Sequence, residues 1–201
     1  MTQSLTPPAP TLSSANPTSW LNVPDEASLP ADIQAIFADQ RKKLGLVHPY
    51  FKGFSLIPEH LRLWFNYYRE LMYGEGELSA KEREIIAVVS SATNHCQSCV
   101  TTHKAALREV TGDAAFADDL VTNRENLELT PREQALADFA VLISQLARDL
   151  DPSELEPLRA VGLSDRAILE AAEIAAQFGL SNRLTKAFGW QVGPEYDQLF
   201  R

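Results

Sequence analysis

Two cysteines and a histidine stand close together in the segment from residue 96 to residue 103. Cys96 and Cys99 are the only cysteines of the chain, and His103 follows four residues after the second. In a helix these three positions fall within about 60° of arc on one face. Two thiols that can close a disulfide, with an acid–base group one turn away, are the parts of a thiol-based redox site. The segment therefore predicts dithiol chemistry.

The expected position of Cys96 favours a reactive thiolate. Asn94 ends the preceding apolar run, and we expect it to cap the helix that carries the cysteines. Cys96 would then lie in the first turn, where free N–H groups and partial positive charge lower the pKa of a thiol. Cys99 would lie one turn further on, within reach of a disulfide. His103 would lie a turn beyond Cys99 and could exchange protons with a thiol near neutral pH.

A carboxylate is expected from the helix that precedes the cysteines. Glu82 and Glu84 both lie at the edges of its apolar stripe. A glutamate partly buried there can act as a general base toward a cysteine or toward His103. Helical geometry does not choose between the two glutamates. A solvated helix charge is the commoner fate of such a residue.

Other interpretations of the cysteine pair are zinc binding and inert thiols. Zinc would need Cys96, Cys99, His103 and a fourth ligand, such as His95 or a glutamate. Structural zinc sites draw their ligands from two separated pairs, and the chain has no second pair. His103 could also be a polar surface residue, and the two histidines that flank loops, His48 and His60, receive no role.

Composition limits the class of partner and the compartment. The chain has 201 residues and a formal net charge of −9, which argues against nucleic acid or an anionic membrane surface as a partner. The first twenty residues lack the basic start and apolar core of a signal peptide, and no apolar run is long enough to span a membrane. We therefore expect a cytoplasmic protein, in which a pair of nearby cysteines is more often catalytic or metal-binding than structural.

The pattern along the chain predicts an all-α fold of roughly seven to nine helices. Residues 1–28 are rich in proline, serine and threonine and predict an extended N-terminal arm, which Trp20, Leu21 and Val23 could anchor. Residues 29–201 form the expected helical domain. Its helices are expected to begin at the capping patterns that start with Ser79, Thr130 and Ser164, after Pro30, and at Pro58 and Asp151, with a further helix over 182–188.

Two aromatic segments are candidates for the surroundings of the thiols. The cluster near residues 64–73 (Trp64, Phe65, Tyr67, Tyr68 and Tyr73) is typical of core or interface packing, and part of it could line the approach to the sulfurs. The segment 51–57, between Pro49 and Pro58, is expected to be a loop that forms a lip of the site.

Glu84, eleven intervening residues, and then Cys96-x-x-Cys99-x-x-x-His103 form a specific pattern. With the stretch 78–99 and the later segments Gly162-Leu163-Ser164-Asp165 and Asn182-Arg183, it resembles the alkylhydroperoxidase AhpD family of the carboxymuconolactone decarboxylase-like superfamily. The branch is the one called peroxidase-related, and the likeness covers roughly residues 30–195.

The resemblance implies an AhpD-like helical bundle, a homo-oligomer, and a peroxidase that needs no haem or metal. By position, Cys99 would attack the peroxide oxygen and become a sulfenic acid, and Cys96 would condense with it to a disulfide. Glu84, rather than Glu82, and His103 would form the proton relay. The implied partners are a hydroperoxide substrate and a dithiol or protein reductant.

The chain departs from the family pattern at one position. Members often carry a histidine directly before the second cysteine, where this chain has Ser98, and a hydroxyl is no base near pH 7. His95 lies about 60° around a helix from Ser98 and nearly a turn earlier, so it cannot take over that position. The departure favours an alternative function, a thiol–disulfide oxidoreductase or redox sensor with little peroxide turnover. A non-catalytic oligomeric protein and a lactone decarboxylase are further alternatives.

Overall fold

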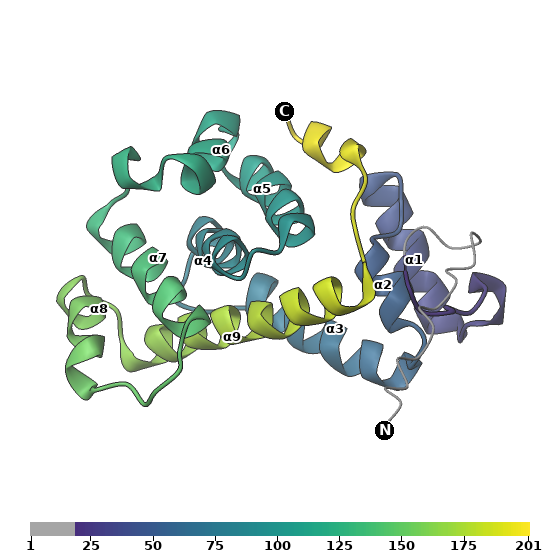
Figure 1. Cartoon of the computed structure of the whole chain (residues 1–201), viewed down its shortest axis with the longest axis horizontal. Coiled ribbons are helices and arrows are strands. Elements are labelled where there is room, and N and C mark those ends of the chain that lie inside the picture. Colours follow the sequence, from purple (N-terminus) through teal and green to yellow (C-terminus); the bar gives the residue numbers. More distant parts are fainter. Residues whose placement is uncertain (1–18) are drawn as a thin grey trace, which may run out of the picture.

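The computed structural model describes residues 19–201, and this part of the chain is helical throughout, with no β-strand. Figure 1 shows its nine α-helices, which lie in two connected groups. The bounds are α1 Ala31–Leu44, α2 Pro49–Phe54, α3 Pro58–Tyr73, α4 Ala80–Thr93, α5 Gln97–Thr111, α6 Ala114–Thr122, α7 Pro131–Ser144, α8 Glu156–Ala160 and α9 Asp165–Phe188. Short 3₁₀ turns lie at Glu26–Ser28, Arg124–Asn126, Pro152–Leu155 and Pro194–Gln198. The all-α prediction is confirmed.

Helix α4 forms the centre of the larger group. Figure 1 shows it nearly end-on, with α5, α7 and α9 around it, and these are the helices that it contacts most. Its run from Ile85 to Val89 is completely or almost completely buried, which explains why its sequence is apolar on all sides. The helix begins at the predicted capping box, in which Ser79 and Glu82 satisfy each other's backbone N–H groups. A carboxylate on α4 is therefore placed inside the protein.

Helix α9 is a single helix of 24 residues, so the prediction of a separate helix over 182–188 is wrong. Gly179 and Asn182 suggested a break. The Arg183 side chain, however, donates back to the Gly179 carbonyl at 2.8 Å. The Asn182 side chain bonds to Ser91 and Asn94 at the end of α4 instead of to its own backbone. The unbroken helix runs from the larger helical group to the smaller one (Figure 1).

A second core joins α1, α2, α3 and the segment after α9. Its members surround Trp190 and include Ile33, Phe37, Tyr50, Phe51 and Leu61. The expected loop over 51–57 is wrong for its first half, because Pro49–Phe54 is a helix. The His48 side chain caps this helix by accepting from the Tyr50 N–H at 3.0 Å, and Pro49 occupies its first turn. The capping turn directs Tyr50 and Phe51 inward.

The described part of the N-terminal arm is attached to the end of α9. The Trp20 N–H donates to the Phe188 carbonyl at 2.9 Å, and the Ser19 hydroxyl accepts from the Trp190 indole N–H at 3.0 Å. Leu21 packs on the second core, while the Trp20 side chain stays 62% exposed. The rest of the predicted arm, residues 1–18, lies outside the described residues.

Two expectations about the setting of the protein stay predictions. Within residues 19–201, no helix combines the length and apolarity needed to cross a membrane, and the cytoplasmic location remains an expectation. The homo-oligomer is likewise untested. Several large apolar side chains on α3 and α9 are exposed in the single chain, namely Leu63, Tyr67, Tyr73, Leu169 and Leu180.

Candidate active site

The cysteine pair lies where α4 turns into α5. Asn94 ends α4 instead of capping α5, so the predicted role of Asn94 is wrong. The reason is a tight turn at His95, which adopts a positive φ of 54° and leaves Cys96 itself at the N-cap of α5. Cys99 therefore lies in the first turn of α5, at the third helical position.

The two sulfurs are 2.7 Å apart and share a hydrogen bond. Both cysteines are free thiols, and both are buried, with 1% of Cys96 and 8% of Cys99 exposed. A disulfide needs a sulfur–sulfur separation of about 2.0 Å, so only a small side-chain movement separates the thiol pair from its oxidised form. The two thiols therefore lie close enough for an intramolecular disulfide to form between them.

The surroundings of the pair favour loss of one proton but not of two. The pKa of Cys96 is lowered, first by its hydrogen bond with the Cys99 thiol and then by the Cys99 backbone N–H and the positive charge of Lys186, against the effect of burial. The same shared hydrogen bond, together with burial, raises the pKa of Cys99 far above its usual range. The favoured state of the pair therefore has one proton, which stays on Cys99, while Cys96 carries the negative charge.

Two side chains of α9 tie the cysteine turn in place. Asn182 is fully buried, accepts from the Asn94 amide at 3.0 Å and donates to the Ser91 hydroxyl at 3.1 Å. Lys186 donates to the Asn94 carbonyl at 3.0 Å. Its ammonium group is held near the turn by this bond, which explains its effect on the pKa of Cys96.

Glu84 and His103 meet across the interface of α4 and α5. Nδ1 of His103 lies 2.8 Å from Oε2 of Glu84, and the two residues are 7% and 3% exposed. The Phe178 ring stands edge-on against the imidazole, with ring centroids 4.5 Å apart, and fixes its plane. Glu82 lies elsewhere: it closes the capping box and accepts from Arg132 at 2.5 Å. The carboxylate beside the predicted site is therefore Glu84.

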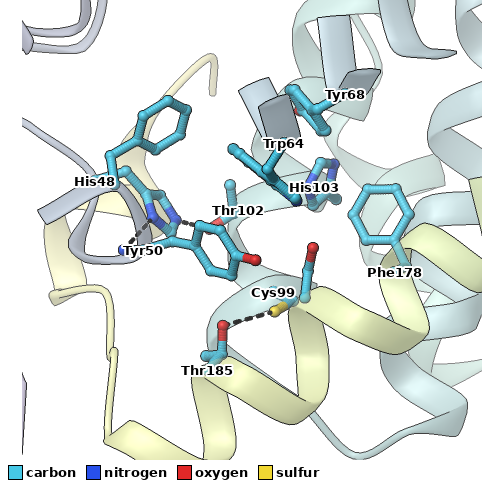
Figure 2. Close-up of a pocket in the computed structure, with 11 residues that line it drawn as sticks. His48, Tyr50, Trp64, Tyr68, Cys99, Thr102, His103, Phe178 and Thr185 are labelled. Atoms are coloured by element: carbon cyan, nitrogen blue, oxygen red, sulfur yellow. Dashed lines mark hydrogen bonds between the residues drawn. The ribbon is translucent and has the colours of Figure 1, made fainter. Parts of the chain in front are cut away.

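Cys99 and His103 open into one cavity of about 60 Å³ between the two helical groups (Figure 2). Its other lining residues come from α2, α3, α5 and α9 and are His48, Tyr50, Phe51, Trp64, Tyr68, Thr102, Phe178, Ser181 and Thr185. Cys96 and Glu84 do not line it. Each stands directly behind its partner, so the cavity reaches one member of the thiol pair and one member of the carboxylate–imidazole pair.

Known proteins of similar sequence and structure identify the family. The carboxymuconolactone decarboxylase family matches residues 58–142. A crystal structure described as an alkylhydroperoxidase AhpD core, an uncharacterized peroxidase-related protein from Ralstonia eutropha JMP134, is 34% identical. The match covers 93% of this chain and 98% of that one, with a TM-score of 0.87. The chain belongs to the AhpD-like branch of the carboxymuconolactone decarboxylase superfamily.

Further comparisons agree with this AhpD-like assignment. An uncharacterized peroxidase-related protein from Silicibacter sp. TM1040 is 32% identical over 94% of this chain and 100% of that chain, with a TM-score of 0.86. The debrominase Bmp8 is 17% identical over 91% of this chain and 95% of that chain, with a TM-score of 0.76, and shares the fold. No curated protein matches the sequence.

Ser98, which stands where many AhpD-like proteins have a histidine, has a structural role here. Its hydroxyl donates to the Trp190 carbonyl and accepts from the Val192 N–H, both at 3.0 Å. The residue is 3% exposed and points away from the cavity that Cys99 lines. His95 is exposed and also outside the cavity. Neither residue is placed to act on the sulfur.

The cavity contains a histidine to which the sequence assigned no role. His48 Nδ1 accepts from the Tyr50 N–H at 3.0 Å, so its proton is on Nε2, which lies 2.9 Å from the Thr102 hydroxyl. Thr102 in turn donates to the Ser98 carbonyl at 2.9 Å. Desolvation, together with the nearby His103, lowers the pKa of His48 to about 3. His48 is therefore a neutral link that connects α2 to α5 beside the cysteines.

The aromatic cluster of α3 divides between the two expected roles. Trp64 and Tyr68 stack with ring centroids 5.1 Å apart and line the cavity, while Tyr67 and Tyr73 are exposed. Phe51, the first residue of the segment expected to be a lip, lines the cavity together with its neighbour Tyr50. In residues 19–201, no three histidine, cysteine, aspartate or glutamate side chains converge as a metal site would require, and the zinc alternative gains no support from the geometry.

Proposed function

We propose that this AhpD-like protein is a thiol-dependent peroxidase that reduces hydrogen peroxide or a small organic hydroperoxide through a Cys96–Cys99 disulfide cycle. One observation carries the proposal: Cys99 and His103 line the same cavity. The Cys99 sulfur lies 2.7 Å from the Cys96 sulfur, and the His103 imidazole is hydrogen-bonded to the buried Glu84 carboxylate. The names of the peroxidase-related relatives support a peroxidase.

In the first step Cys99 attacks the terminal oxygen of the hydroperoxide. Cys99 transfers its proton to the Cys96 thiolate across the shared hydrogen bond, and its sulfur forms the new S–O bond as the O–O bond breaks. The sulfur is oxidised and the peroxide is reduced. His103, held by Glu84, gives a proton to the departing alkoxide, which leaves as an alcohol.

In the second step Cys96 attacks the Cys99 sulfenic acid. The S–S bond forms, the S–O bond breaks, and the hydroxyl group leaves as water with the Cys96 proton. An external dithiol then reduces the disulfide by exchange and becomes a disulfide itself, which restores both thiols.

The burial of the sulfurs favours a small oxidant over a protein disulfide. A protein partner must bring its own sulfur into line with the attacked one, and neither Cys96 nor Cys99 is exposed enough for that. A hydroperoxide needs only the cavity. The oxidant of the thiols is therefore better explained as a hydroperoxide than as a protein disulfide, which favours the peroxidase over the thiol–disulfide oxidoreductase.

The test is peroxide consumption with a small dithiol as reductant. We expect turnover by the wild-type protein, none by Cys99→Ser, and at most a single slow event by Cys96→Ser because no disulfide can form. His103→Gln should turn over far more slowly. His60→Gln is the matched control, since His60 is exposed and outside the cavity, and should match wild type. Unchanged consumption by Cys99→Ser would contradict the proposal.

A further inference from the structure

Two buried hydrogen-bond donors around the cavity have no partner in the protein. Among residues 19–201, eight buried side-chain polar atoms lack a partner, and two of them, the Tyr50 hydroxyl and the Trp64 indole N–H, belong to side chains that line the cavity. Leaving a buried polar group unpaired destabilises the folded protein, so such groups usually serve a ligand or water. Two hydrogen-bond donors without a partner therefore belong to the walls of the cavity that Cys99 lines.

Tyr50 is held by packed aromatic rings with its hydroxyl in the cavity that Cys99 also lines. Its ring packs edge-on against Trp190 at 5.0 Å and against Phe54 at 5.5 Å, and tilted on Trp64 at 4.6 Å. Figure 2 shows the hydroxyl pointing from the ring of Tyr50 into the space that Cys99, Thr102 and His103 surround. The Ser181 hydroxyl, on another wall of the cavity, lies close enough to lower the pKa of Tyr50 as a hydrogen-bond partner would. The two hydroxyls do not reach hydrogen-bond geometry, so the Tyr50 hydroxyl stays without a partner.

The hydroxyl of Tyr50 keeps its proton at neutral pH. Burial raises the pKa of Tyr50 well above its usual range, and the nearby Cys99 acts in the same direction. A neutral phenol is a hydrogen-bond donor to an oxygen that carries negative charge. The only titratable groups among the other lining residues are His48, Tyr68, Cys99 and His103.

We propose that the Tyr50 hydroxyl binds the leaving oxygen of the hydroperoxide while Cys99 attacks the terminal one. The inference rests on the proposed peroxidase function and adds a catalytic residue from α2. As the O–O bond breaks, its electron pair stays on the leaving oxygen, where the Tyr50 O–H donates a hydrogen bond without losing its proton. His103 supplies the proton that completes the alcohol. The walls around this contact are aromatic and the cavity is small, so the substrate class is a compact hydroperoxide.

The test compares Tyr50→Phe with Tyr196→Phe. Tyr196 is a matched control because it is equally buried, its hydroxyl also lacks a partner, and it does not line the cavity. Two rates are measured on the reduced protein: formation of the Cys96–Cys99 disulfide by hydrogen peroxide, and alkylation of the thiols by iodoacetamide. The first needs a leaving oxygen to be stabilised, and the second does not.

We expect Tyr50→Phe to slow disulfide formation by about 10- to 100-fold, the range for one hydrogen bond to a charged oxygen, with alkylation within about twofold of wild type. Tyr196→Phe should change neither rate. Equal peroxide rates for Tyr50→Phe and wild type would overturn the inference and leave the proposed function standing. Parallel loss of both rates would also overturn it, because Tyr50 would then shape the thiol pair. If wild type itself forms no disulfide with peroxide, the proposed function fails first.

Discussion

Glu84 and His103 are joined by a hydrogen bond of 2.8 Å between a carboxylate on α4 and an imidazole on α5, both of them buried. The bond engages Nδ1, so Nε2 is the ring nitrogen that His103 offers to the cavity. A buried carboxylate behind an imidazole fixes the orientation of the ring. In the proposed cycle this pair would supply the proton, with His103 facing the cavity and Glu84 behind it.

Replacing Glu84 with glutamine should slow peroxide reduction while the fold persists. Glutamine keeps the shape of the side chain and can still accept from His103, but it removes the negative charge beside the imidazole that transfers the proton in the proposed cycle. We expect a loss of roughly 10²-fold or more in the rate of disulfide formation, the lower range for general acid–base catalysis. Stopped-flow measurement of disulfide formation with peroxide checks this.

Glu82→Gln is the matched control on the same helix. Glu82 is buried too, but it bonds to Ser79 and Arg132 and does not line the cavity. We expect a loss of about 1–2 kcal/mol in the free energy of unfolding, typical of a damaged helix cap, with the peroxide rate near wild type. The opposite pattern, a stable but inactive Glu82→Gln and an active Glu84→Gln, would contradict the assignment of the relay.

The charge of Lys186 should set the pH at which the thiol pair becomes reactive. The pKa of Cys96 is lowered by the Cys99 hydrogen bond and, in smaller part, by Lys186, so alkylation by iodoacetamide should rise at a pH below the usual thiol value of about 8.5. Lys186→Gln should move this rise to higher pH. Arg183→Gln removes a positive charge from the same helix, where the side chain is turned back to Gly179, and should leave the profile in place. Identical profiles for Lys186→Gln and wild type would contradict the electrostatic account.

Ser98 should matter for stability rather than for chemistry. Ser98→Ala leaves the Trp190 carbonyl and the Val192 N–H without their bonds, which should cost about 1–3 kcal/mol in the free energy of unfolding. Ser98→His, which restores the residue of many relatives, should destabilise the protein more because the site is buried. Urea unfolding and peroxide assays check both variants. A faster peroxidase from Ser98→His would show that the serine limits the chemistry.

His48 should make the protein less stable in acid. Its folded-state pKa of about 3 lies below the ordinary value of 6.5. Between these two pH values the unfolded chain binds a proton at His48 and the folded protein does not. Its contribution to stability is complete above pH 6.5 and is lost as the pH falls toward 3. His48→Gln cannot take up this proton, so its urea midpoint should fall less than that of wild type between neutral pH and a pH midway in this window. Equal decreases would contradict the assignment of a neutral His48.

Local signals predicted most helix starts, while positions that depend on tertiary contacts were missed. The capping boxes at Ser79 and Thr130 are complete in the structure, because both partners lie within three residues of each other. The turn at His95 and the unbroken helix through Asn182 were not predicted. Both depend on contacts with distant helices, to which no local pattern points.

The same distinction holds for the site. The sequence spacing predicted a site made of Glu84, Cys96, Cys99 and His103. In the structure these residues form two hydrogen-bonded pairs. Tyr50 and His48 reach the cavity from α2, a helix of six residues between two prolines, and nothing in the sequence relates that segment to a cysteine about fifty positions later. An inward-facing aromatic run after a possible His–Pro cap was the single available signal.

The most direct test is the intact mass of the reduced protein after one equivalent of hydrogen peroxide, followed by trapping of free thiols. We predict that wild type becomes two hydrogen atoms lighter and resists the trap, and that Cys96→Ser becomes one oxygen atom heavier, with the oxygen on Cys99. Wild type that keeps both thiols, or Cys99→Ser that is oxidised as fast as wild type, would contradict the claim that Cys99 receives the peroxide and Cys96 closes the disulfide.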